Sequence, residues 1–183
     1  MVKRLASLVL WLGGWKIEGE LPKHRKAVII SVPHTSGWDF VWGELCFLSK
    51  GLPIYVLMKK ETFFFPLNVL LKNLNVIPVD RGSRHSVLVQ NIVSEFNSRD
   101  DMYLCLTPEG SRKKVKKWKK GFLVIAQEAQ VPIYLGRIDY KNRTCDFGRV
   151  FHPSSNIESD LRYIMSTYRD VHPKYPDNFS CGE

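Results

Sequence analysis

The sequence predicts an α/β sandwich, a single domain in which helices flank a largely parallel central sheet. Short apolar segments rich in β-branched residues alternate with longer amphipathic segments, as in such folds. The chain has 183 residues and a mass of 21.2 kDa, which is close to the size of one domain. With 44% hydrophobic and 12% aromatic residues it can bury a substantial core. Wholesale disorder is therefore excluded.

Six segments have the composition of buried or half-buried strands. They are residues 27–32, 53–57, 76–79, 102–106, 131–138 and, near an edge of the sheet, 145–151. Between and after them lie segments of helical length, at residues 38–48, 62–74, 86–97, 118–130 and 157–168. A helix between successive strands is typical of the crossover that joins parallel neighbours.

The ends of the chain differ from this alternating pattern. Residues 1–20 begin with Lys3 and Arg4 and continue as an apolar run that carries Trp11 and Trp15. The run is too short to span a bilayer and lacks a cleavage site, so two interpretations remain: a helix in the membrane interface or a helix packed on the domain. Residues 21–172 form the expected domain, and residues 173–183 a polar, loosely packed tail.

The positive charge is concentrated in one segment. The formal net charge is +9, and the seven lysines and arginines of residues 112–120 account for all but +2 of it. Such a cluster suits phosphates, an anionic bilayer or an acidic partner. The alternative is a solvated lysine-rich surface without a ligand.

The cysteines give no sign of a metal site. Cys46, Cys105, Cys145 and Cys181 are widely spaced, with no C-x-x-C pair and no histidine at zinc-ligand spacing. Cys46 and Cys105 have apolar neighbours and are predicted to be core residues. We expect no structural disulfide and a reducing, cytoplasmic compartment.

Polar, glycine-bearing segments follow three of the predicted strands, at residues 33–39, 80–84 and 107–112. Ligands of open α/β sheets bind at the carboxyl ends of the strands. We therefore expect these three segments to converge on one edge of the sheet.

The first of these segments offers a general base. If Gly37 allows the chain to turn, the carboxylate of Asp39 can accept a hydrogen bond from Nδ1 of His34, which leaves Nε2 free to take a proton from a hydroxyl group. The alternative is an isolated histidine beside an aspartate that caps the following helix.

The other two segments offer an anion site. Arg81 and Arg112 are suited to bind a phosphate, and Gly110 allows the backbone to approach a ligand closely. Glu109 is suited to hold an arginine or to bind a substrate hydroxyl. The alternative is a β-turn with surface charges.

Four blocks occur in the order found in one enzyme family. They are H-x-x-x-x-D at residues 34–39, a segment from Lys60-Glu61 to Arg81, P-E-G-S-R at residues 108–112, and V-P-I at residues 131–133. Over residues 27–138 the chain resembles the glycerolipid acyltransferases, which include the 1-acylglycerol-3-phosphate acyltransferases. The first and third blocks are the specific ones.

The resemblance implies a glycerol-3-phosphate acyltransferase-like fold and a reaction. A fatty acyl group passes directly from a thioester, acyl-CoA or acyl carrier protein, to the hydroxyl of a lysophospholipid such as 1-acylglycerol-3-phosphate. It implies that His34 is the base and that Asp39 orients it, with no metal and no cofactor besides the co-substrate. The residues implied to hold the acceptor are Arg81, Glu109, Gly110, Ser111 and Arg112.

One departure from the family pattern leaves the acceptor open. Where a glycine usually precedes the strand at residues 76–79, this chain has Asn73-Leu74-Asn75. A lyso-aminolipid acceptor is therefore an alternative. A second alternative, from another class of protein, is a basic module that binds membranes or nucleic acid. No nucleic-acid-binding signature is present, and we expect no nucleic-acid partner.

Three roles for the lysine-rich segment remain open: contact with anionic lipids, binding of coenzyme A phosphates, and docking of acyl carrier protein. Trp118 favours the membrane, where indole rings concentrate at the boundary. We expect an enzyme peripherally associated with the inner face of the cell membrane. Of Phe63, Phe64 and Phe65, at least two are expected in the core and the remainder along an acyl groove.

Overall fold

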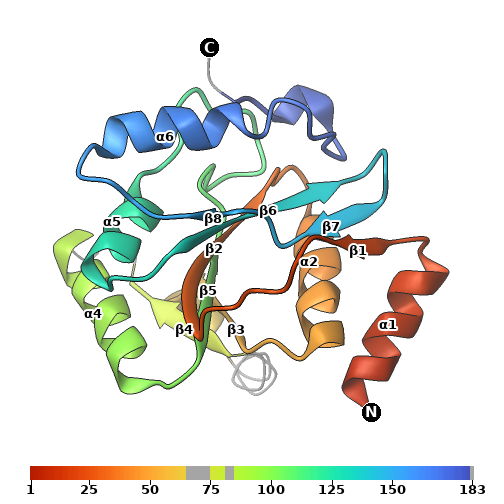
Figure 1. Ribbon diagram of the computed structural model, residues 1–183, viewed down its shortest axis with the longest axis horizontal. Helices are drawn as coiled ribbons and strands as arrows, with labels where there is room; N and C mark the ends of the chain where they lie inside the picture. Colours follow the sequence, from red (N-terminus) through yellow and green to blue (C-terminus); the bar gives the residue numbers. More distant parts are fainter. Residues whose placement is uncertain (65–74, 81–84, 182–183) are drawn as a thin grey trace.

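The computed structural model describes residues 1–64, 75–80 and 85–181 and shows the predicted α/β sandwich (Figure 1). The described residues form an eight-stranded, mostly parallel sheet with five α-helices around it. The predicted fold class is confirmed.

The central strand of the sheet is β2 (Lys26–Val32), which pairs in parallel with both of its neighbours. The strand order is β1-β7-β6-β2-β5-β3-β4, and β8 also pairs with β6. The other strands are β1 (Lys16–Glu18), β3 (Ile54–Lys59), β4 (Val76–Val79), β5 (Met102–Leu106), β6 (Ile133–Asp139), β7 (Thr144–Asp146) and β8 (Val150–Phe151).

The edge beyond β6 differs from the prediction. The single strand expected over residues 145–151 is two short strands, β7 and β8, which both run antiparallel to β6. Gly148 separates them with φ +81, a conformation that breaks strand geometry and that glycine adopts without strain. Strand β1 was not predicted, because its three residues Lys-Ile-Glu contain no apolar run.

The helices lie on both faces of the sheet. Helix α2 (Gly37–Lys50) covers one face, and α4 (His85–Ser98), α5 (Gly121–Glu128) and α6 (Ile157–Ser166) cover the other (Figure 1). Helix α5 begins three residues later than predicted, because residues 112–120 form an irregular segment. The helix expected over residues 62–74 falls mostly outside the described residues. At its start the structure describes a 3₁₀ turn, η1 (Lys60–Thr62).

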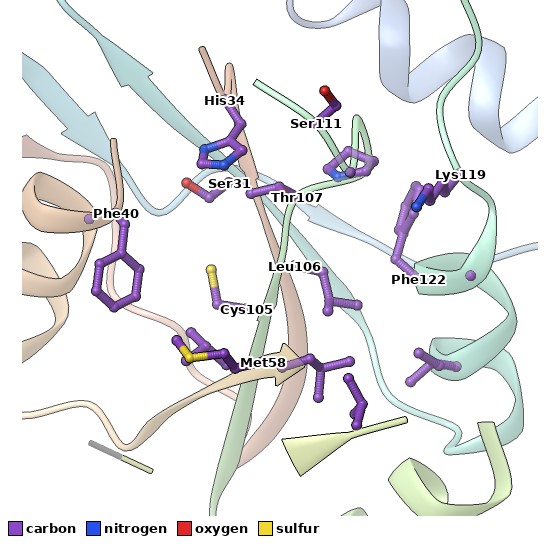
Figure 2. Close-up of a pocket in the computed structure, with 18 of the residues that line it drawn as sticks. Ser31, His34, Phe40, Met58, Cys105, Leu106, Thr107, Ser111, Lys119 and Phe122 are labelled. Atoms are coloured by element: carbon purple, nitrogen blue, oxygen red, sulfur yellow. The ribbon is translucent and has the colours of Figure 1, made fainter. Parts of the chain in front are cut away.

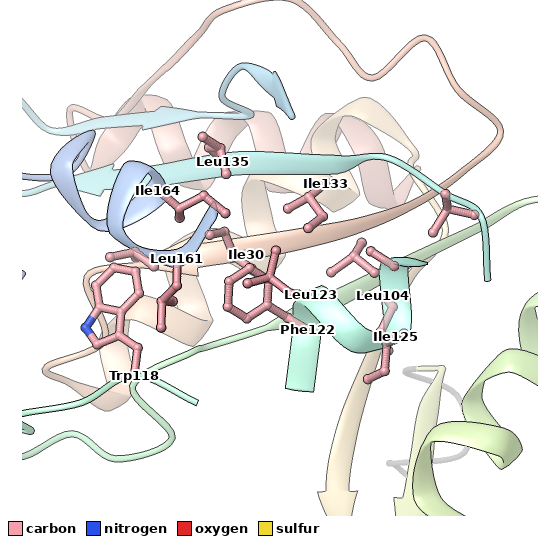
Figure 3. Packing of buried hydrophobic residues seen from close by; sticks show 14 of the residues in the cluster. Ile30, Leu104, Trp118, Phe122, Leu123, Ile125, Ile133, Leu135, Leu161 and Ile164 are labelled. Atoms are coloured by element: carbon pink, nitrogen blue, oxygen red, sulfur yellow. The ribbon is translucent and has the colours of Figure 1, made fainter. Parts of the chain in front are cut away.

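The larger core lies between the sheet and the three helices α4–α6. Alternate residues of β2 face it, among them Ile30, and pack with Leu104, Ile133 and Phe122 (Figure 3). Trp118 belongs to this core: its indole is 3% exposed and donates its N–H to the carbonyl of Ser180 over 3.1 Å. The prediction that Trp118 lies at a membrane boundary is therefore wrong, because its ring is buried in the core.

The N-terminal helix α1 (Val2–Leu12) packs on α2. Ala6 and Leu10 are buried on its inner side, and Trp15 beyond it stacks on Trp42 with ring centroids 5.0 Å apart. Leu8 and Trp11 face outward and are exposed. Of the two tryptophans expected at a membrane interface, only Trp11 is free to reach one. Among the described residues, no helix is both long and apolar enough to cross a bilayer.

The last described residues contact the domain near the carboxyl ends of the strands. A short 3₁₀ turn, η2 (Pro176–Asn178), follows Tyr175, whose backbone N–H donates to the hydroxyl of Thr35 over 3.3 Å. Phe179 packs against the larger core. The divisions of the chain after residues 20 and 172 stay predictions.

Candidate active site

The segments that follow β2 and β5 are joined by one hydrogen bond. The backbone N–H of His34 donates to Oε1 of Glu109 over 2.8 Å. Asp80, which follows β4, lines the same cavity as His34. The expected convergence at one edge of the sheet is confirmed for the described residues, while Arg81 lies outside them.

His34 and Asp39 face each other, with Nδ1 of the imidazole 3.5 Å from Oδ2 of the carboxylate. The same Oδ2 accepts hydrogen bonds of 2.7 Å from the backbone N–H groups of Thr35 and Ser36. Ser36 in turn caps the first turn of α2. Asp39 therefore takes part in the cap of α2, as the alternative interpretation expected, but His34 is not isolated, since the same carboxylate lies against its imidazole.

Tyr140, which follows β6, completes the surroundings of Asp39. Its hydroxyl donates to Oδ1 over 2.6 Å. Burial opposes ionisation of Asp39, but the hydrogen bonds from His34, Tyr140 and the two backbone N–H groups outweigh it and hold the pKa of the carboxyl below its ordinary value. Asp39 is therefore an ionised carboxylate that is held in place beside the imidazole of His34.

Sequence reasoning missed Tyr140. It belongs to none of the four blocks, and the available signal was its position: it directly follows a predicted strand, at the sheet edge where ligands bind.

Glu109 is 5% exposed, and its carboxylate is directed at the backbone of His34. Its second oxygen, Oε2, has no hydrogen-bond partner among the described residues. Burial raises the pKa of Glu109 to about 7, although the hydrogen bond from His34 opposes this. In this structure Glu109 fixes the position of His34, whereas its neighbours Gly110, Ser111 and Arg112 line the cavity.

The cavity beside His34 has a volume of about 1160 Å³. His34, Ser111 and Lys119 lie on one side of it, and Phe40, Met58 and Leu106 lie on another (Figure 2). The side chains of the first group are polar and those of the second are apolar. Such a cavity fits an amphipathic ligand with a charged end and a hydrocarbon end.

Cations line the polar part of the cavity. The guanidinium of Arg112 lies against Gly37 at the start of α2, where Nη1 is 3.4 Å from the place of a Cβ atom. The side chain of Lys119 crosses Gly110, which has φ +61 and leaves no room for a side chain of its own. Lys113 and Lys120 line the same cavity. The sequence analysis left phosphate binding open for the lysine-rich segment as a whole, but it did not show which of its lysines line the cavity.

The apolar part of the cavity is not formed as expected. Phe64 is 60% exposed, Phe63 is half-buried, and neither is among the described lining residues, while Phe65 lies outside the described residues. Phe63 and Phe64 follow the 3₁₀ turn η1 without helical structure, and the rest of the helix predicted over residues 62–74 lies outside the described residues. Cys46 is buried as predicted, whereas Cys105 lines the cavity instead of the core interior.

The departure from the family pattern before β4 has a local explanation. Asn75 adopts φ +51, in the left-handed region that glycine favours. Asparagine is among the residues that tolerate this conformation best. The turn into β4 therefore keeps a left-handed residue without a glycine.

The buried carboxyl of Glu109 makes stability depend on pH. The folded pKa of Glu109, about 7, exceeds the ordinary value of 4.5 that the unfolded chain retains. Between these values the folded state binds more protons than the unfolded state, so the stability falls as the pH rises. We predict that Glu109→Gln gains stability relative to wild type from pH 5 to pH 7, by at most about 1.4 kcal/mol per pH unit. Urea unfolding at each pH measures this. The exposed Glu128→Gln is the control, and a pH-independent difference for Glu109→Gln would contradict the prediction.

Comparison with known proteins agrees with this geometry. Residues 15–135 match the sequence model of the family described as Acyltransferase. The match covers both His34 and the P-E-G-S-R segment. Searches of the curated proteins and of the solved structures returned no match. The matched region is about two-thirds of the chain, and the chain therefore belongs to the Acyltransferase family and is an acyltransferase enzyme.

Proposed function

We propose that this enzyme transfers a fatty acyl group from a thioester donor, acyl-CoA or acyl carrier protein, to the hydroxyl of a lysophospholipid, with His34 as general base. One observation carries the proposal: His34 lines a single cavity that has cations in one part and hydrocarbon side chains in another. The phosphate of a lysophospholipid matches the cations, and the hydrocarbon side chains suit the fatty acyl chains of the donor and the acceptor.

The geometry supports a direct transfer. With Nδ1 of His34 facing Asp39, Nε2 is the nitrogen available to the acceptor hydroxyl. As the hydroxyl oxygen attacks the thioester carbonyl, Nε2 takes its proton and Asp39 stabilises the imidazolium. When the carbon–sulfur bond breaks, the imidazolium returns the proton to the thiolate. An ester and a free thiol result, and the histidine regains its initial state.

The charges of the cavity favour a phosphate-bearing acceptor over a lyso-aminolipid. Arg112, Lys113, Lys119 and Lys120 all line it, and Asp80 is the acid that follows β4 there. The charge of Lys120 is partly offset by its ion pair with Glu158 on α6. Arg112 lies against Gly37 and Lys119 against Gly110. A cationic head group would be repelled by this arrangement. We assign Arg112, Ser111 and the backbone at Gly110 to the acceptor, with Lys119 as a further phosphate ligand and Arg81 assigned from the family pattern alone.

The outer face of α1 supports peripheral association with an anionic membrane. Its exposed apolar residues are spaced at helical intervals, and exposed Lys3 and Arg4 precede them. They are Leu5 (60% exposed), Leu8 (50%), Val9 (37%), Trp11 (73%) and Leu12 (70%). An exposed apolar stripe with adjacent cations is typical of helices that lie in the membrane interface.

Replacing the base tests the reaction. His34→Ala is expected to lower kcat by roughly a hundredfold to ten-thousandfold, because proton removal from the hydroxyl is lost. The measurement is product mass after incubation of labelled acyl-CoA or acyl carrier protein with a panel of lysolipids. His152→Ala, at an exposed histidine outside the cavity, is the control. Wild-type turnover by a folded His34→Ala protein would refute the assignment.

Replacing the anion ligand tests the acceptor. Arg112→Ala is expected to raise the KM for the lysophospholipid about ten- to a hundredfold, because a charge-assisted hydrogen bond to phosphate is lost. The KM for the thioester should change little. Lys116→Ala removes a charge from the same segment at an exposed residue that does not line the cavity, and serves as control. Equal effects of the two substitutions would contradict the assignment.

Replacing the outer face of α1 tests membrane association. Leu8→Glu and Trp11→Glu are each expected to reduce cosedimentation with anionic vesicles by about tenfold. Each substitution places a charge where an exposed apolar side chain would enter the bilayer. Val87→Glu places the same charge at an exposed apolar residue of α4 and is the control. Undiminished binding by both α1 variants would show that this face does not contact the bilayer.

A further inference from the structure

A carboxyl group interrupts the apolar wall of the cavity. Helix α2 contributes Asp39 in its first turn, beside His34, and then Phe40, Gly43, Glu44 and Phe47 farther along. Their spacing of three and four places them on one face of the helix. The facing wall is formed by Ile54 and Val56 of β3. Beyond Asp39, which contacts His34, Glu44 is the acid that α2 places in the cavity.

Glu44 makes no hydrogen bond or ion pair within the described residues, since the contact recorded for it is an electrostatic one with Cys105. Burial raises the pKa of Glu44 to about 7. Burial, and then the charge of Glu44, raise the pKa of the Cys105 thiol to about 12, so that the thiol stays neutral. A neutral carboxyl is both a hydrogen-bond donor and an acceptor.

Two further polar groups lie between the base and this wall. Ser31 on β2 and Cys105 on the adjacent β5 line the cavity below His34 (Figure 2). Alternation along β2 puts Ser31 on the same face as Ile29, the face that α2 covers. Weak hydrogen-bonding groups therefore continue from the reacting centre into the apolar part.

We infer that this cavity selects an acyl chain that carries a hydroxyl group, with Glu44 as the hydrogen-bond partner of that hydroxyl. The inference concerns the acyl chain of the donor and rests on the proposed function, which brings the donor's thioester, and with it the donor's acyl chain, into the cavity at His34. A plain hydrocarbon chain would remove water from Glu44 and leave its polar atoms unpaired. A hydroxylated chain replaces that water with a hydrogen bond, and sites of this kind discriminate strongly against analogues that lack the hydroxyl.

Acyl-CoA donors of one chain length test the inference when they differ only in a hydroxyl group placed near the thioester, near the middle or near the end of the chain. For wild type, kcat/KM is expected to be at least about tenfold higher with one hydroxylated donor than with the plain one. Glu44→Leu should abolish this ratio and raise kcat/KM for the plain donor, whereas Glu44→Gln should keep most of it. The exposed Glu128→Leu should leave the ratio unchanged.

Several results would overturn the inference. They are a wild type without preference for any hydroxylated donor, a Glu44→Leu variant that keeps the preference, and an equal loss with all donors. The last would show that Glu44 contacts a part common to the donors, such as the thioester arm. Glu44→Gln retains the shape of the side chain and guards against a folding defect in Glu44→Leu.

A binding measurement separates this inference from the proposed function. Plain and hydroxylated free fatty acids compete with a fluorescent fatty acid for wild type and Glu44→Leu. If wild type transfers no acyl group, the proposed function fails, yet the ratio of dissociation constants still reports on Glu44. A ratio that is equal in the two proteins would overturn the inference.

Discussion

The arrangement of the site depends on the buried hydrogen bond from the backbone N–H of His34 to the carboxylate of Glu109. It joins the ends of two adjacent parallel strands, β2 and β5, which share five paired residues below this point. The bond places the imidazole beside the P-E-G-S-R segment. A carboxylate that is 5% exposed is costly to bury, and it retains one oxygen without a described partner. Its presence is understandable as a requirement of the site, because it fixes the backbone of His34, the base that we propose.

The second support of His34 comes from chain segments outside the four blocks. Tyr140 fixes Asp39 from the end of β6, and its own backbone N–H donates to the carbonyl of His172 over 2.9 Å. His172 also contacts Asp139, with Nδ1 3.1 Å from the carboxylate. The ring of Trp15 meets Tyr140 edge to face with centroids 5.1 Å apart. Residues near both ends of the chain thus hold the tyrosine that holds the aspartate.

How much of this was predictable depends on whether the signal was local. The strands β2, β4 and β5 were predictable because each is a continuous apolar run. The pairing of His34 with Asp39 was predictable because both belong to one short turn. Tyr140, Lys119 and Glu44 were not, because their roles come from packing between distant segments. The prediction for Trp118 was wrong for the same reason, because its basic neighbours in the sequence do not reveal that the indole packs in the core.

The structure divides the lysine-rich segment into lysines that line the cavity and lysines that do not. Lys113, Lys119 and Lys120 line the cavity, where a phosphate of the acceptor or donor would bind. Lys114, Lys116 and Lys117 are exposed and are not among the described lining residues. Burial of Trp118 anchors the segment to the core directly before Lys119 and Lys120, while Lys113 lines the cavity from the other end of the segment. A single run of charge can therefore bind substrate with some residues, while the others remain free for an anionic bilayer or an acidic carrier protein.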